Sequence, residues 1–154
     1  MKKYKQTVIP EASTNEWKHL SVKDMRKRML DEYQKRHKGK NVVNQHLGIT
    51  INFQTFGAKK TSRGAAAYSK KACLISVLDK LVRYAEYSNW GERKSTGPSS
   101  VVGFLNFKAK VKIDGKLEHI HLAVCLRNDG KFHYSMEVNK KSRQVYVPGF
   151  DICS

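Results

Sequence analysis

Two long runs of alternating apolar and polar residues, joined by Asp114-Gly115, constrain the fold more than any other feature of the sequence. An Asp-Gly pair between such runs is a strong signal for a two-residue hairpin turn. This turn sets Ile113 opposite Lys116, and the register that follows matches apolar residues across one face. The sequence therefore predicts a long antiparallel hairpin with one buried face. Its apolar pairs are Leu105 with Val124, Phe107 with Leu122, and Ala109 with Ile120.

A second turn, Asn128-Asp129-Gly130, predicts the register of a third strand. A two-residue Asp-Gly turn would set Val124 against Ser135 and would therefore bury polar groups. A three-residue loop with Gly130 in the left-handed conformation sets Val124 against Tyr134 and matches apolar faces instead. The three-residue loop is therefore the prediction, and it extends the hairpin into a β-meander.

The opposite face of this meander is polar and rich in histidine. The register sets Lys108 opposite His121 and Lys110 opposite His119, and it puts Glu137 of the third strand on the other side of His121. An ordinary solvated face would favour Thr, Lys and Glu, whereas this face collects half of the six histidines in the chain. The face is therefore the candidate functional site. Its members are Lys108, Lys110, His119, His121, His133, Ser135 and Glu137.

Histidine and lysine on one face suit the cleavage of RNA without a metal ion. That reaction needs a base for the 2′-hydroxyl proton, an acid for the leaving 5′-oxygen, and cations for the charged phosphorane. Imidazole titrates near neutrality and can serve in either proton role. The expected roles are His121 as general base or acid oriented by Glu137, His133 or His119 as second proton carrier, Ser135 as a phosphate ligand, and Lys108 and Lys110 as stabilising cations.

Simpler interpretations stay open for the same residues. A half-exposed strand with cross-strand charge pairs needs no catalysis. His119 and His121 have the spacing of metal ligands, but the neighbouring lysines would repel a dication, so no metal site is predicted. Cys125 beside His133 resembles a nucleophilic pair, yet no third group orients it, which favours an inert thiol.

The first third of the sequence predicts an extended segment followed by helices. Residues 1–12 lack periodicity and are expected to be extended. A capping-box pattern predicts a short helix over 13–20. Ser21 begins a second helix, whose apolar residues recur at helical spacing until Gly39 offers a C-cap.

The middle of the chain predicts one strand and one long helix. Alternation from Leu47 predicts a strand that ends at Gly57. An apolar stripe predicts a helix from about Gly64 to Ser88, and a loop over 89–99 follows. The expected fold is α+β, with N-terminal helices plus one long helix packed on one face of a four-stranded antiparallel sheet that ends in the β-meander. The expected division is an N-terminal segment with helices (1–45), an α+β domain (46–140) and a C-terminal tail (141–154).

Charge indicates the kind of partner. Thirty Lys and Arg against thirteen Asp and Glu give a net charge of +17, spread along the chain rather than gathered in a tail. A polyanion would relieve the resulting self-repulsion, and nucleic acid is the common polyanion. Lys59, Lys60 and Arg63 form a basic turn before the predicted long helix, where backbone amides and cations can bind phosphate. The turn lacks the glycines of a nucleotide-binding loop, so no cofactor is predicted.

Other classes of protein are excluded by what the sequence lacks. No apolar run approaches the roughly 20 residues that a membrane span needs, so a membrane partner is not expected. The basic start has no apolar stretch behind it, which excludes a secretory signal. Three widely spaced cysteines favour a reducing compartment, so the expected location is the cytoplasm.

The order of the elements and two stretches of sequence, VKIDGKLEHIHLAV and GKFHYSMEV, resemble a known family. They are similar to the nuclease-like domains of the Barnase–EndoU–colicin–RelE class that occur in large polyvalent proteins of phages and mobile elements. The similarity covers about residues 46–140. It implies helices on one side of a four-stranded antiparallel sheet and metal-independent endoribonuclease chemistry on the exposed face. By position, Lys60 or Arg63, His121 and Ser135 are the residues it points to, although no fixed triad matches residue by residue.

The sequence therefore favours an endoribonuclease-like toxin or phage effector that acts on RNA rather than DNA, in the host cytoplasm if a phage encodes it. One alternative is a non-catalytic nucleic-acid-binding module, or a phage inhibitor of a host nucleoprotein. An inhibitory or target protein would then be a further partner. Another alternative is an interaction domain with no nucleic-acid partner.

Overall fold

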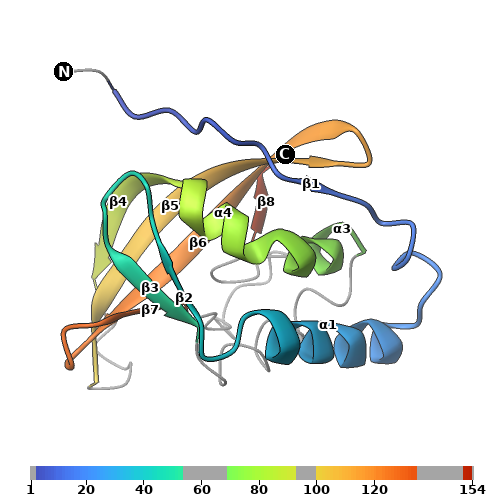
Figure 1. The fold of residues 1–154 in the computed structure, drawn as a ribbon, viewed down its shortest axis with the longest axis horizontal. Helices are drawn as coiled ribbons and strands as arrows, with labels where there is room; N and C mark the ends of the chain where they lie inside the picture. The colour runs from blue at the N-terminus through green and yellow to red at the C-terminus, as the bar shows by residue number, and fades with distance from the viewer. Residues whose placement is uncertain (1–2, 54–68, 93–99, 135–150, 154) are drawn as a thin grey trace.

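The centre of the fold is the long hairpin of β5 (Val101–Ile113) and β6 (Lys116–Arg127), seen here in a computed structural model (Figure 1). The structure describes residues 3–53, 69–92, 100–134 and 151–153. The predicted register is confirmed at the turn, where Ile113 lies opposite Lys116, and at each apolar pair along the ladder. Both turn residues have positive φ, 52° at Asp114 and 80° at Gly115, which is the geometry that an Asp-Gly turn favours.

The three-residue loop after β6 is also confirmed. Strand β7 (Phe132–Tyr134) pairs antiparallel with β6, and Val124 lies opposite Tyr134 as predicted. Gly130 has a φ of 75°, the left-handed conformation that this loop requires. The apolar residues of the two strands therefore share one face, because an offset of one residue would have turned Tyr134 to the other side.

The rest of the sheet corrects the predicted topology. The described residues form an eight-stranded mixed sheet in the order β1-β5-β6-β7-β3-β2, with β4 paired to β5 and β8 paired to β6. Strands β1 with β5, and β3 with β7, run parallel. The expected four-stranded antiparallel sheet is therefore wrong, because parallel neighbours are joined by long connections and leave no turn signal in the sequence. The five further strands are β1 (Glu11–Ala12), β2 (Asn41–Val43), β3 (Thr50–Phe53), β4 (Glu86–Glu92) and β8 (Asp151–Cys153).

Helix α1 (Val22–Arg36) begins where the sequence predicts it. The hydroxyl of its N-cap, Ser21, accepts a hydrogen bond from the backbone N–H of Asp24 at 3.1 Å. Gly39 follows the helix with a φ of 76°. The short helix expected over 13–20 is wrong, because Thr14 closes a turn by accepting two backbone hydrogen bonds and no helix continues from it.

The single long helix expected from Gly64 to Ser88 is also wrong. Residues 64–68 lie outside the described residues, and the rest divides into α3 (Ser69–Ala72), the 3-10 helix η1 (Cys73–Val77) and α4 (Leu78–Tyr84). The chain turns extended at Ala85 (ψ 144°) and continues as β4. Most side chains of η1 are buried, so packing on all sides outweighs the one-sided stripe that the periodicity indicated.

The helices cover the apolar face of the hairpin, as the sequence predicts. Helix α4 lies across β5 (Figure 1), and one continuous core joins both layers. This core runs from Trp17 to Tyr134, and α1 contributes Met25, Met29 and Tyr33 to it. The division of the chain at residues 45 and 140 stays a prediction. Among the described residues, no helix combines the length and apolarity needed to cross a bilayer.

The N-terminal segment continues the edge of β5 beyond the end of β4. The side-chain amide of Gln6 hydrogen-bonds both the N–H and the carbonyl of Lys110, at 2.6 and 2.8 Å. Strand β1 then pairs with Lys112 and Ile113. At the hairpin turn, the carboxylate of Asp114 accepts hydrogen bonds from the backbone N–H and the hydroxyl of Thr14. The segment therefore supports the end of β5 that carries Lys110.

Asn44 joins the β2–β3 connection to the end of α4. Its side chain is fully buried, its Nδ2 donates to the carbonyls of Val82 and Ala85, and its Oδ1 accepts from the N–H groups of His46 and Leu47. The two bonds to carbonyls satisfy buried backbone groups at the end of α4, and the other two fix the turn that follows Asn44.

His37 is a buried imidazole between α1 and η1. It is 2% exposed, and its Nε2 donates to the carbonyl of Ile75 at 2.7 Å. Burial lowers the pKa of His37, and Arg36 and Lys40 add to this effect, whereas the bond to Ile75 and the charge of Asp79 oppose it. The folded protein therefore holds His37 neutral under conditions in which the unfolded chain protonates it.

We expect this difference to weaken the fold in mild acid. Below the unfolded pKa of about 6.5 the unfolded state binds a proton that the folded state does not, so the free energy of unfolding falls as the pH falls. His37→Gln removes this proton uptake. Urea unfolding between pH 8 and pH 5 should show the stability gap between the native protein and the variant narrowing toward low pH. A gap that stays constant or widens would contradict the assignment.

Candidate functional site

The polar face of the hairpin carries two lysines and two histidines in the predicted register. Lys108 lies opposite His121, and Lys110 lies opposite His119. Lys108, His119 and His121 are exposed, and Lys110 is half-buried. Because the helices cover the other side of β5 and β6, these four side chains lie on the face that the helices leave uncovered.

Strand β4 extends this face on the other edge of β5. Its register shifts between Tyr87 and Asn89, which makes Ser88 the extra residue of a β-bulge. Before the bulge, Tyr87 packs on Phe107 with ring centroids 5.8 Å apart. After it, Asn89 lies opposite Asn106. The bulge thus allows Tyr87 to pack in the core while Ser88 and Asn89 reach the polar face.

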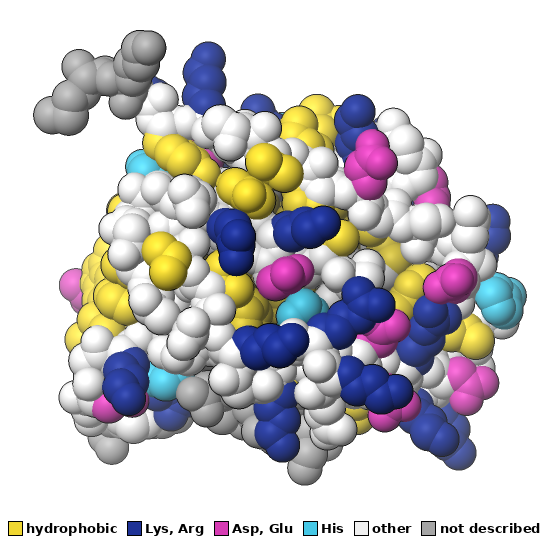
Figure 2. Space-filling model, in the orientation of Figure 1, with side chains coloured by type: hydrophobic (Ala, Val, Ile, Leu, Met, Phe, Trp, Pro, Cys, Tyr) yellow, Lys and Arg dark blue, Asp and Glu magenta, His cyan; other side chains and the backbone are white. Residues whose placement is uncertain are grey.

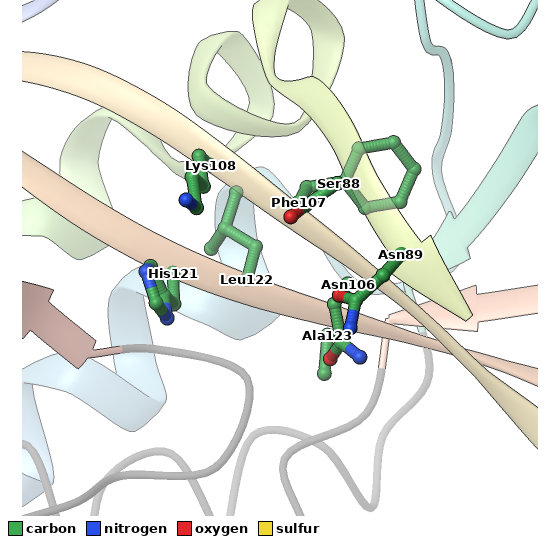
Figure 3. Close-up of a pocket in the computed structure, with 8 residues that line it drawn as sticks. All are labelled: Ser88, Asn89, Asn106, Phe107, Lys108, His121, Leu122 and Ala123. Atoms are coloured by element: carbon green, nitrogen blue, oxygen red, sulfur yellow. The ribbon is translucent and has the colours of Figure 1, made fainter. Parts of the chain in front are cut away.

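A cavity of about 230 Å³ lies at this bulge (Figure 3). Lys108 and His121 are at one end, and Asn89, Asn106 and Ala123 are at the other. Ala123 belongs to β6, and its small side chain leaves space in front of the two asparagines. The lining consists of Ser88, Asn89, Asn106, Phe107, Lys108, His121, Leu122 and Ala123.

Two glycines allow β4 to lie close to β5. A Cβ on Gly91 would lie 3.2 Å from the Nδ2 of Asn106, so the absence of a side chain makes space for that amide. A Cβ on Gly103 would lie 2.1 Å from the ring of Trp90, so the indole rests directly on the glycine. Trp90 is 40% exposed, and its indole contacts β5 at this one glycine.

Glu86 adds a carboxylate beside the lysines. It lies opposite Lys108 in the ladder, and its Oε1 accepts a hydrogen bond from the N–H of Gln6 at 3.0 Å. Three strands therefore place Glu86, Lys108 and His121 at successive positions of one row.

The structure separates His133 from the exposed group. It lies opposite Cys125 as predicted, but its side chain is only 5% exposed and its Nε2 lies 3.1 Å from Oδ2 of Asp129. Hydrogen bonds from Lys131, and then from His133, lower the pKa of Asp129. This pair spans the loop between β6 and β7, which gives His133 a structural role there. Cys125 is fully buried.

Several predicted site residues lie outside the described residues. They are Lys59, Lys60, Arg63, Ser135 and Glu137. Asp151 of β8 lies opposite His121 in the ladder. Strand β8 thus takes the edge of β6 that the meander was expected to fill.

The contribution of β4 was not predicted from the sequence. The predicted helix included Glu86 and Ser88, and the predicted loop included Asn89. The predicted register assigned no role to Asn106. The signal that could have found β4 was the glycine at 103, because a glycine inside a strand marks either a bulge or the close approach of a neighbour, and here both occur. The residue that approaches it closely is Trp90.

Positive charge is spread over more than this face. Figure 2 shows Lys and Arg scattered over the helix side with acidic groups between them, rather than in one stripe. Helix α1 exposes Lys23, Arg26, Lys27 and Lys35. Charge alone therefore does not distinguish one face, whereas the cavity does. Within the described ranges, no three His, Cys, Asp or Glu residues gather closely enough to hold a metal ion.

Comparison with known proteins gives one match. A family model described as large polyvalent protein-associated domain 3 matches residues 21–134. No curated protein and no solved structure matches the chain. The matched region begins at the N-cap of α1 and ends with β7, so it includes the residues that line the cavity.

We expect Gly103→Ala to displace Trp90 and loosen β4. The added methyl group overlaps the indole, and relieving that overlap should cost about 1–3 kcal/mol of the free energy of unfolding. In a Trp17→Phe background Trp90 is the one remaining tryptophan, so acrylamide quenching reports its exposure. Quenching should increase in Gly103→Ala and stay unchanged in the control Val102→Ala, whose side chain is exposed on the neighbouring residue. Equal quenching in both would contradict the packing role.

Proposed function

We propose that this chain, which belongs to the large polyvalent protein-associated domain 3 family, binds RNA on its polar sheet face. The family assignment confirms the expected link to large polyvalent proteins of phages and mobile elements. RNA binding is the proposal drawn from the site itself.

The observation that carries the proposal is the cavity at the β4 bulge, which has an amine and an imidazole at one end. Lys108 and His121 line it, and Lys110 and His119 stand one row further along the same face. Backbone phosphates spaced along a nucleic acid can follow this row. Binding lysines to phosphate releases counterions, which is the main favourable term in such complexes.

RNA is favoured over DNA because of the polar groups beside the cations. Ser88, Asn89 and Asn106 offer hydroxyl and amide groups that both donate and accept hydrogen bonds. A ribose 2′-hydroxyl is likewise a donor and an acceptor, and it is the group by which a protein distinguishes RNA from DNA.

We expect Lys108→Ala with Lys110→Ala to weaken RNA binding and its dependence on salt. Each lysine that no longer neutralises a phosphate lowers the slope of log K against log salt by about 0.7 for a single strand, so the slope of the double variant should fall by about 1.4. Fluorescence anisotropy with a labelled RNA oligonucleotide, repeated over a range of KCl concentrations, measures both effects.

The matched control is Lys116→Ala with Lys131→Ala, which removes the same charge from exposed positions at the two turns. It should keep most of the native slope. If the slope falls equally in both double variants, binding follows net charge and the sheet face is not the site.

A second candidate is cleavage of the bound RNA. It is favoured by one observation, the exposed pair His119 and His121 on the same strand and face, beside Lys110 and Lys108. One imidazole would take the 2′-hydroxyl proton and the other would protonate the leaving 5′-oxygen, with the lysines next to the phosphorane. Because His133 is buried against Asp129, His119 is the stronger second proton carrier.

We expect cleavage to resist EDTA, to yield a 2′,3′-cyclic phosphate and to disappear in His121→Ala. Removing a general acid or base costs about 10²–10⁴-fold in rate. End-labelled RNA resolved on a gel measures the rate, and His19→Ala, which removes an exposed histidine far along the chain, is the control. If the native protein binds RNA without cleaving it, the cleavage hypothesis is rejected and the binding hypothesis stands.

A further inference from the structure

We propose that the cavity at the β4 bulge holds one nucleotide of a single-stranded RNA, with its base at the asparagine end and its phosphate at the Lys108–His121 end. This inference rests on the proposed RNA binding and adds which form of RNA is bound and how. It assigns a nucleotide subsite to residues Ser88, Asn89, Asn106 and Ala123, none of which carries positive charge.

The size of the cavity decides what it can hold. Its volume of about 230 Å³ is below the range of roughly 300–1,000 Å³ that drug-sized ligands occupy. It therefore suits a single flat ring system rather than a larger group. A base in a duplex is stacked and paired, so reaching the cavity would require unpairing it at a cost of a few kcal/mol. A single strand presents its bases without that cost.

The chemistry of the two ends matches the two ends of a nucleotide. The amides of Asn89 and Asn106 each offer donors and an acceptor, which are the groups that pair with the edges of bases. Lys108 and His121, at the other end in Figure 3, suit a phosphate. Because the two ends are separated along the strands, a ligand with one flat ring and one anionic group fits better than phosphate alone.

The asparagine end is held by the sheet rather than by a loop. Asn106 belongs to the central strand β5, and its Nδ2 occupies the space that Gly91 leaves open. Asn89 is placed by the bulge, and the adjoining Trp90 packs on Gly103. Groups on strands that are already anchored lose little freedom on binding, which favours recognition by hydrogen bonds.

Filling the cavity without changing its charge tests the inference. Ala123→Leu adds apolar volume at the base end, and the control Val43→Leu adds apolar volume at an exposed position that does not line the cavity. Asn89→Ala, at an exposed position, is a second variant that leaves the packing of β6 unchanged. Circular dichroism and thermal unfolding establish that each variant is folded.

Anisotropy is measured with a 12-nucleotide unpaired RNA and with a blunt-ended RNA duplex of equal charge. We expect Ala123→Leu and Asn89→Ala to bind the unpaired RNA about tenfold or more weakly, because base contacts of this kind are worth about 1–3 kcal/mol. Both should bind the duplex as the native protein does, and Val43→Leu should bind both RNAs as the native protein does. Adenosine and uridine 5′-monophosphates should shift the NMR signals of the Asn89 and Asn106 amides.

The failure of this inference differs from the failure of RNA binding. If the native protein binds both RNAs and the filled variants bind them equally well, the nucleotide subsite is rejected and binding to the face stands. If the native protein binds neither RNA at low salt, both proposals are overturned.

Discussion

The register of β5 against β6 is the constraint on which the rest of the structure depends. It is set at the Asp114-Gly115 turn, whose two positive φ angles leave one way to pair the strands. A shift of one residue would carry Lys108 and His121 under the helices and expose Phe107 and Leu122. Both edges of the hairpin are then shared, with β4 and the N-terminal segment along β5, and β7 and β8 along β6. The core and the cavity are thus two faces of the same ladder.

The parts of the fold that depend on neighbouring residues in the sequence could be predicted. The two turns, the paired apolar residues and the N-cap at Ser21 could be deduced because each depends on neighbours in the sequence. The parallel pairs β1–β5 and β3–β7 could not, because they join segments far apart in the chain. Strand β4 was missed for a more specific reason. Tyr87 packs on Phe107 and the exposed Trp90 rests on Gly103, and the bulge between them gives a spacing of three that is also typical of a helix.

Part of the candidate site could be predicted because it depends on the local register of the hairpin. Lys108, Lys110, His119 and His121 belong to the hairpin, so its register placed them together. His133 also kept its register, but alternation shows which face a residue lies on and not how deeply it is covered. Glu137 lies outside the described residues, and the ladder position beside His121 is taken by Asp151 of β8, from the far end of the chain. The cavity could not be predicted from the hairpin alone, because Ser88 and Asn89 of β4 form part of its lining.

The bulge at Ser88 allows one short strand both to pack on β5 and to line the cavity. Tyr87 packs on Phe107 and the exposed Trp90 rests on Gly103, while Ser88 and Asn89 line the cavity. Substitution on the cavity side therefore leaves the anchoring contacts intact. Two or three substitutions on the cavity side of this strand can change which ligand a related domain recognises without destabilising its fold. Ligand specificity can therefore evolve faster here than the fold itself.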